Sequence, residues 1–140
     1  MTDPNQDSDH EFRTGSCICG SVKFETRGHL RNVIFCHCQQ CRKQSGHYYA
    51  ATSVEDARLY VTGEEHITWY AASAAAKRGF CRVCGSALFW KREASEVTSI
   101  MAGLFDSPTG LKGGYHIFTN EKGDYYTVAD GLPCFSYSDD

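Results

Sequence analysis

The sequence lacks an apolar run long enough to cross a bilayer, and it lacks an excess of positive charge. A membrane-spanning helix needs roughly 18 or more consecutive apolar residues, and no stretch of the 140 residues approaches that length. Lysine and arginine number 14 against 17 aspartate and glutamate residues, which gives a net charge of −3. Such a chain lacks the excess of positive charge that attracts the phosphate backbone of a nucleic acid. We therefore expect neither a membrane nor a nucleic acid among its partners.

The sequence also lacks an export signal at its start. Residues 1–10 are acidic and polar, without the basic start and the apolar stretch of a signal peptide. We expect a cytoplasmic protein in which residues 1–12 form a disordered acidic tail and residues 13–140 form one domain. The apolar fraction of 41% is enough for that domain to bury a core.

Long helical patterns are absent as well, because no segment keeps a period of 3.6 residues for more than about ten residues. Residues 71–77 contain strong helix formers but are too few for a stable helix, and residues 53–56 resemble only a helix start. The chain instead contains short runs rich in Val, Ile, Thr, Tyr and Phe, separated by breaks that carry glycine. These runs predict an all-β fold of short, mostly antiparallel strands. The predicted strands are residues 22–25, 30–35, 48–54, 59–62, 67–70, 87–90, 97–102, 115–119 and 125–128.

Eight cysteines are the most informative residues that the chain does contain. A secreted protein of this size would pair them in disulfides, whereas a cytosolic protein would use them as thiolates on a metal. The missing export signal and the tight spacing of the cysteines favour metal. They form C-x-C, C-x-C-x-x-C and C-x-x-C clusters and one isolated residue: Cys17 and Cys19; Cys36, Cys38 and Cys41; Cys81 and Cys84; and Cys134.

Two of these clusters together match a closed structural zinc site, which takes four tetrahedral ligands. Cys81-Arg82-Val83-Cys84-Gly85 forms a knuckle whose trailing glycine supplies a tight turn, and Cys17-Ile18-Cys19-Gly20 is a narrower version. We therefore expect one structural zinc on Cys17, Cys19, Cys81 and Cys84. Such a zinc would join parts of the chain about sixty residues apart and so restrict the unfolded state. The alternative is that these are free buried cysteines.

The third cluster, Cys36-His37-Cys38-Gln39-Gln40-Cys41, offers three thiols. Three protein ligands and one open position for water or substrate are typical of a catalytic zinc. We therefore expect Cys36, Cys38 and Cys41 to hold a second, open zinc and to be the catalytic residues. Three alternatives stay open: His37 or Cys134 closes the site as a fourth ligand, the thiols act as a redox device, or the site is metal-free. The side chain of His37 is expected to point away from the metal, since two ligands flank it.

The cysteine motifs extend into flanking residues that carry further information. They read Gly15-Ser16-Cys17-Ile18-Cys19-Gly20-Ser21-Val22, then Phe35-Cys36-His37-Cys38-Gln39-Gln40-Cys41-Arg42-Lys43-Gln44-Ser45-Gly46, then Gly79-Phe80-Cys81-Arg82-Val83-Cys84-Gly85-Ser86. Downstream lie His116-Ile117-Phe118, Lys122 and Asp130-Gly131-Leu132-Pro133. Over about residues 13–135 the chain resembles the glutathione-dependent formaldehyde-activating enzyme family.

The resemblance implies a zinc-bearing β-tent fold, with a closed zinc on the four-cysteine set and an active-site zinc on the three-cysteine set. It also implies a carbon–sulfur lyase whose synthetic direction forms S-(hydroxymethyl)glutathione, so the expected partners are glutathione, or a related small thiol, and formaldehyde. A shared domain does not fix the substrate. Two alternatives therefore remain: a non-catalytic zinc-stapled module that binds a small thiol or a protein, and a redox sensor built on the three thiols.

Overall fold

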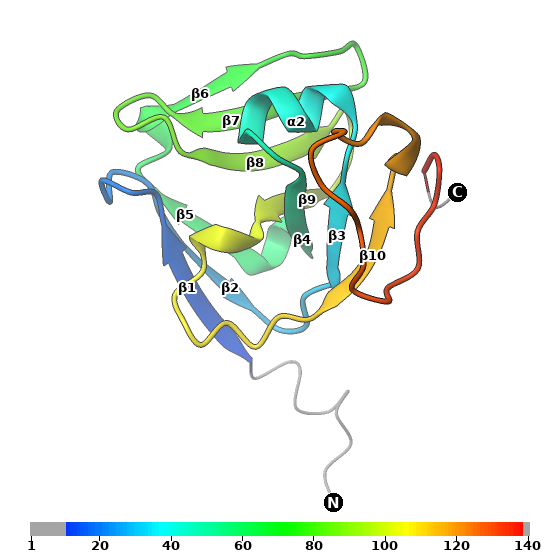
Figure 1. Ribbon diagram of the computed structural model, residues 1–140. Helices are drawn as coiled ribbons and strands as arrows, with labels where there is room; N and C mark the ends of the chain where they lie inside the picture. Colours follow the sequence, from blue (N-terminus) through cyan, green and yellow to red (C-terminus); the bar gives the residue numbers. More distant parts are fainter. Residues whose placement is uncertain (1–10, 139–140) are drawn as a thin grey trace, which may run out of the picture.

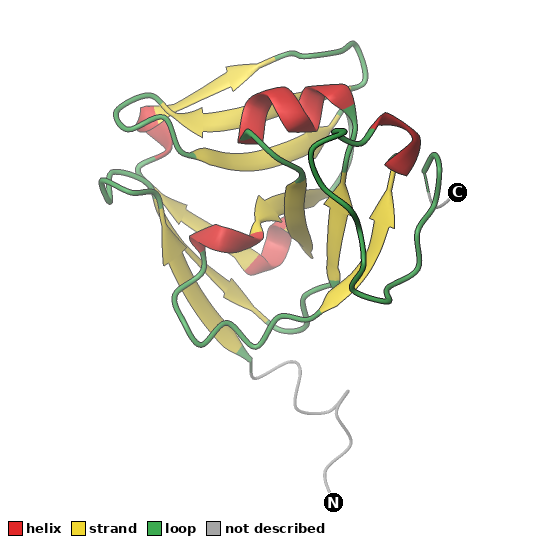
Figure 2. Cartoon of the chain, viewed as in Figure 1, coloured by secondary structure: helices red, strands yellow, loops and turns green. Residues whose placement is uncertain are grey.

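The computed structural model describes residues 11–138 of the chain. These residues form two β-sheets, one short α-helix and several single turns of 3-10 helix (Figures 1 and 2). The tail predicted for residues 1–12 lies almost wholly outside the described residues, and Phe12 is already the first residue of a strand. Within the described part, no helix is long and apolar enough to span a membrane.

The smaller sheet has three strands in the order β1-β2-β5, and both of its pairings are antiparallel. Along β2, Phe24 and Thr26 are buried whereas Lys23 and Arg27 are exposed, as expected of a strand with one face on the core. The three strands are β1 (Phe12–Ser16), β2 (Lys23–Arg27) and β5 (Leu59–Thr62).

The larger sheet has seven strands in the order β10-β3-β4-β9-β8-β7-β6. Its pairings are antiparallel except for that of β10 with β3, which is parallel. The strands are β3 (Val33–Cys36), β4 (Tyr49–Glu55), β6 (Ile67–Tyr70), β7 (Ala76–Cys81), β8 (Ala87–Arg92), β9 (Val97–Met101) and β10 (Gly113–Ile117). The prediction of a mostly antiparallel, all-β single domain is therefore confirmed.

One α-helix, α2 (Gln39–Ser45), connects β3 to β4. In Figure 1 it lies beside β7, and side-chain hydrogen bonds between the two elements agree with that placement. Its position matters because it begins inside the three-cysteine motif. The remaining helical turns are η2 (Asp56–Arg58), η3 (Glu64–His66), η4 (Ala102–Leu104) and η5 (Thr119–Glu121).

The main core lies between the two sheets. Phe24 of β2 packs edge-on against Phe89 of β8, with ring centroids 6.1 Å apart, and against Phe105, with centroids 5.1 Å apart. Leu88 and Ile100 are fully buried in the same cluster. Each side chain of this kind stabilises the folded state by about 1.5–3 kcal/mol when it leaves water. The core therefore fixes the smaller sheet, and the loop after β1, against the larger sheet.

The sequence predicts β2 to β6 and β8 to β10 but misses β1, β7 and α2. The strand predicted at residues 125–128 is wrong, because this segment is irregular and the Tyr126 hydroxyl hydrogen-bonds to a buried histidine. The composition of β7 explains why that strand was missed. β7 contains Ala, Lys, Arg and Gly, which have little strand preference, and it forms a strand because β6 and β8 pair with it on both sides.

Candidate metal centres

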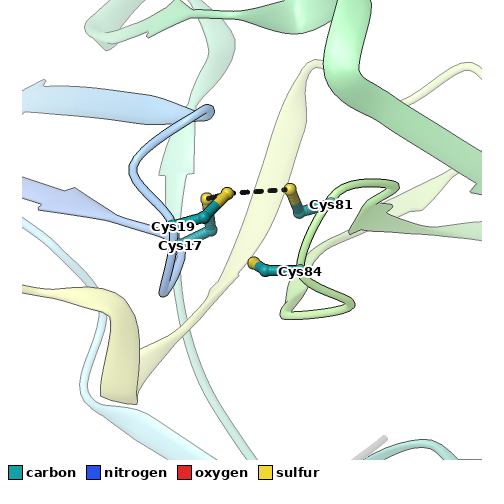
Figure 3. A group of neighbouring side chains, drawn as sticks. All are labelled: Cys17, Cys19, Cys81 and Cys84. Carbon is teal, nitrogen blue, oxygen red and sulfur yellow. Dashed lines mark hydrogen bonds between the residues drawn. The ribbon is translucent and has the colours of Figure 1, made fainter.

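Four cysteines from two distant turns meet beside the main core (Figure 3). Cys17 and Cys19 lie in the loop between β1 and β2, Cys81 ends β7, and Cys84 lies in the turn before β8. All four sulfur atoms lie within 4.8 Å of one another. The structure thus brings together the four residues that the sequence groups into one site.

Local backbone geometry explains why the four sulfurs converge. Gly20 and Gly85 follow the two motifs with φ angles of +80° and +83°, and their N–H groups donate to the carbonyls of Cys17 at 3.2 Å and Cys81 at 2.7 Å. A residue with a Cβ atom would be strained at those φ angles. The hydroxyl of Ser86 accepts the N–H of Ile18 at 3.1 Å, which links one turn to the other.

The donor set of this four-cysteine site fits a structural zinc. Cys17 and Cys81 are buried, and the sulfur of Cys17 accepts the N–H of Val22 at 3.3 Å. Hydrogen bonding to Ser86 lowers the pKa of Cys84 to about 5, which favours the thiolate form of this group. Four sulfur atoms this close together could hold one tetrahedral ion without further ligands.

A second group of three cysteines lies where β3 passes into α2. Cys36 ends β3, Cys38 is the N-cap of α2 and Cys41 lies in the first turn of that helix. Their sulfurs also lie within 4.8 Å of one another. The sulfur of Cys38 accepts the N–H of Cys41 at 3.4 Å, a contact that caps the helix and favours the thiolate form. The fold therefore fixes the relative positions of these three sulfurs.

Within the described part of the chain, this three-cysteine site gains no fourth ligand. Among residues 11–138, no other His, Cys, Asp or Glu places a ligand atom within 4.8 Å of all three sulfurs. Cys134 is exposed, and its sulfur lies 3.5 Å from the carbonyl of Leu132. His37 is completely buried, but both of its ring nitrogens bond to other side chains. Cys134 and His37, the two residues considered from the sequence as a fourth ligand, thus both direct their ligand atoms to other contacts.

His37 belongs to a hydrogen-bonded chain of four side chains, of which His37 and His116 are buried. Its Nδ1 atom lies 2.5 Å from the hydroxyl of Tyr126, and its Nε2 atom lies 2.8 Å from Nδ1 of His116. The chain ends at Asp130, whose carboxylate lies 2.8 Å from Nε2 of His116. In Figure 1 the segment that carries Tyr126 and Asp130 crosses in front of β3 and β10. The sequence expectation that His37 points away from the metal agrees with these contacts.

Arg78 lies beside the three-cysteine site, a position that sequence reasoning did not single out. The sequence presents Lys77 and Arg78 as equivalent neighbouring cations, yet Lys77 is exposed and only 6% of Arg78 is exposed. The Nη2 atom of Arg78 lies 3.4 Å from the sulfur of Cys41. The signal that could have separated the two residues is strand alternation, but β7 was not recognised as a strand.

Comparisons with known proteins show the family and the fold of this chain. The model of the glutathione-dependent formaldehyde-activating enzyme family matches residues 12–121, well over half of the chain. An uncharacterized lyase of Schizosaccharomyces pombe is 25% identical over 123 residues, which cover 87% of this chain and 89% of the relative. The crystal structure of a Rhodobacter sphaeroides protein shares the fold with a TM-score of 0.57 and 23% identity, covering 87% of this chain and 98% of that protein. This chain therefore belongs to the glutathione-dependent formaldehyde-activating enzyme family.

Proposed function

We propose that this protein joins formaldehyde to the sulfur of glutathione, or of a related small thiol, at a zinc ion held by Cys36, Cys38 and Cys41. The proposal is carried by the gathering of three sulfurs without a fourth His, Cys, Asp or Glu ligand among the described residues. Such a donor set leaves a tetrahedral ion one position for a ligand from solution. Family membership and the lyase name of the S. pombe relative support the class of reaction.

The proposed reaction is an addition that needs no oxidant or reductant. Bound zinc would supply positive charge that favours the deprotonated form of an incoming thiol. A carbon–sulfur bond forms to the carbonyl carbon of formaldehyde, the carbon–oxygen π bond breaks, and the oxygen takes up the proton that the thiol lost. The reverse sequence cleaves the carbon–sulfur bond. As three thiolates, Cys36, Cys38 and Cys41 donate much negative charge, which favours delivery of the thiol over polarisation of the carbonyl.

The four-cysteine site has a different role in this proposal. Cys17, Cys19, Cys81 and Cys84 would hold a zinc ion that closes its own coordination and joins the two sheets. All eight cysteines are free thiols in the structure, and thiols of this kind persist in a reducing compartment. We therefore place the proposed activity in the cytoplasm.

Zinc content and adduct exchange test the proposal directly. Elemental analysis of protein purified with reductant and without chelator is expected to give two zinc ions per chain. Because the addition also proceeds without a catalyst, its rate is best followed at equilibrium by ¹³C exchange spectroscopy between labelled formaldehyde and its glutathione adduct. Exchange is expected to be faster with the protein than with buffer alone.

Two cysteine variants supply the comparison. Cys38→Ser is expected to keep one zinc and to lose the acceleration, whereas Cys134→Ser removes an exposed thiol outside both sites and should behave as the wild type. Exchange at the buffer rate in a wild-type protein with two zinc ions would overturn the enzyme proposal. If glutathione still perturbed one of the two ions in that case, a thiol-binding module would be the better description.

A further inference from the structure

Arg78 brings a positive charge into the interior beside the three-cysteine site. It lies on β7 with only 6% of its surface exposed, and its guanidinium stacks over the ring of Tyr49 at 5.4 Å. Nη1 donates to the side-chain oxygen of Gln44 at 2.9 Å, and Nη2 lies 3.4 Å from that of Gln40. Both glutamines belong to α2, so the guanidinium is enclosed between that helix and β4.

No carboxylate among residues 11–138 compensates this buried charge. Within the described part of the chain, no Asp or Glu lies within 4.0 Å of Arg78, whose protein acceptors are two neutral amides. The remaining polar contact is the sulfur of Cys41, at 3.4 Å from Nη2. Of the four buried side-chain polar atoms that lack a hydrogen-bond partner among the described residues, two lie here: Nε of Arg78 and the hydroxyl of Tyr49. An arginine buried to this degree requires a nearby anion.

The metal-bound thiolates of Cys36, Cys38 and Cys41 would supply that negative charge. Three thiolates on a divalent ion carry one net negative charge, which the guanidinium balances. Three protonated thiols would instead leave the buried guanidinium without any counter-charge. The surroundings of Cys36, Cys38 and Cys41 thus fit a bound divalent metal, on grounds that do not depend on the family.

We propose that Arg78 is a positioning residue that sets the charge of this site and so selects an anionic sulfur ligand for the open position. The inference rests on the proposed function, because it concerns the ligand of the same metal. When a thiolate binds, the site gains a second negative charge, which a neighbouring fixed cation stabilises in an interior of low dielectric. A neutral ligand adds no charge, so its affinity should not depend on Arg78.

Cobalt substitution makes the two ligand classes measurable at the metal itself. Protein reconstituted with Co²⁺ is titrated with 2-mercaptoethanol, whose body is uncharged, and separately with imidazole, and the visible absorption of the ion is recorded. Arg78→Gln is expected to weaken thiol binding by roughly tenfold or more, the size expected for one charge-assisted interaction, without changing imidazole binding. Arg78→Lys restores the charge and should recover most of the thiol affinity.

Two further variants keep the comparison interpretable. Lys77→Gln removes the neighbouring cation, which is exposed and lies over Trp69 at 4.5 Å, and it should bind both ligands as the wild type does. Gln44→Glu leaves Arg78 in place but puts a carboxylate at the position that now accepts from Nη1. It should weaken thiol binding in the same way, even if Arg78→Gln does not fold. The cobalt band of the four-cysteine site reports folding in each variant.

The possible outcomes separate this inference from the proposed function. If the wild type takes up one metal ion, or if thiol leaves its spectrum unchanged, the proposed open site is wrong. If the wild type binds thiol and both Arg78→Gln and Gln44→Glu bind it equally well, the open site stands and Arg78 has only a packing role. Equal weakening of thiol and imidazole binding would also overturn the charge argument, since loss of local structure affects both ligands.

Discussion

The Nε2 atom of His37 lies 2.8 Å from the Nδ1 atom of His116, and the other ring nitrogen of His116 lies 2.8 Å from the carboxylate of Asp130. Hydrogen bonding to His116 holds the pKa of Asp130 below its ordinary value, so the carboxylate is ionised and can only accept. His116 therefore donates from Nε2, and a neutral His116 ring accepts at Nδ1. Burial lowers the pKa of His37 to about 4, so its ring is neutral at pH 7. When both rings are neutral, the proton between them belongs to His37.

All the hydrogen bonds that link Tyr126, His37, His116 and Asp130 are therefore expected to run in one direction, with each donor on the Tyr126 side. At pH 7 both rings should carry their proton on Nε2, with the Tyr126 hydroxyl donating to Nδ1 of His37. Long-range ¹⁵N–¹H correlation spectra of the zinc-loaded protein distinguish protonated from unprotonated ring nitrogens. His29 is exposed and provides an internal reference for a ring in solvent. A protonated Nδ1 on His116 would contradict the assignment.

Replacing Asp130 by asparagine is expected to destabilise the fold most at neutral pH. A carboxyl group whose pKa is lowered on folding stabilises the folded state above its unfolded pKa of about 4. That contribution is lost as the pH falls through the folded pKa. The difference in unfolding free energy between wild type and Asp130→Asn should therefore be largest near pH 7 and should decrease below about pH 4. Urea unfolding followed by tryptophan fluorescence between pH 7 and pH 3 measures it.

Asp124→Asn is the matched control for this experiment. It removes an exposed carboxylate from the same segment of the chain, and its effect on stability should be small at every pH. Loss of zinc in acid affects all three proteins alike, so the differences between them remain informative. A difference for Asp130→Asn that stays constant from pH 7 to pH 3 would mean that the His116 contact does not act through charge.

Removing the hydroxyl of Tyr126 tests the other end of the chain. Tyr126→Phe leaves Nδ1 of the buried His37 ring without its donor, which should lower the free energy of unfolding by about 1 kcal/mol. Tyr125→Phe is the control, because that ring is 60% exposed and its hydroxyl makes only a long contact to His47, at 3.5 Å. Chemical denaturation of the zinc-loaded proteins gives both values. Equal effects in the two variants would show that the His37 contact contributes nothing specific.

The grouping of the cysteines could be read from the sequence because it depends on local spacing. Cys81-x-x-Cys84 and Cys17-x-Cys19 are short motifs whose chemistry limits their possible partners, and the structure places their sulfurs together. The strands were predicted where side-chain preference and pairing agree, as in β4 and β9. In these cases the residues that form the sequence pattern also make the contacts seen in the folded structure.

The surroundings of the metal site could not be read in the same way. Arg78 and Lys77 are adjacent cations on opposite sides of β7. The side chain of Arg78 is therefore buried, whereas that of Lys77 is exposed to solvent. Helix α2 is too short for its periodicity to appear in the sequence. The contact between His37 and Tyr126 joins residues far apart in the chain and depends on how the C-terminal segment folds over β3. Long-range packing decides each of these features, and no local motif records it.

The difference between the two cysteine sites leads to a prediction about stability. Cys81→Ser removes a ligand that is fully buried beside the main core, and it should unfold the protein or cause it to aggregate. The reason is that the free energy of metal binding at a closed site contributes directly to folding. Cys38→Ser should instead fold and retain one zinc, because serine can also cap α2 and the closed site stays intact. Thermal unfolding and zinc analysis of both variants check these outcomes, with Cys134→Ser as the control for loss of a thiol. If Cys38→Ser unfolds as readily as Cys81→Ser, both sites support the fold alike, and the division into a structural and an open centre is wrong.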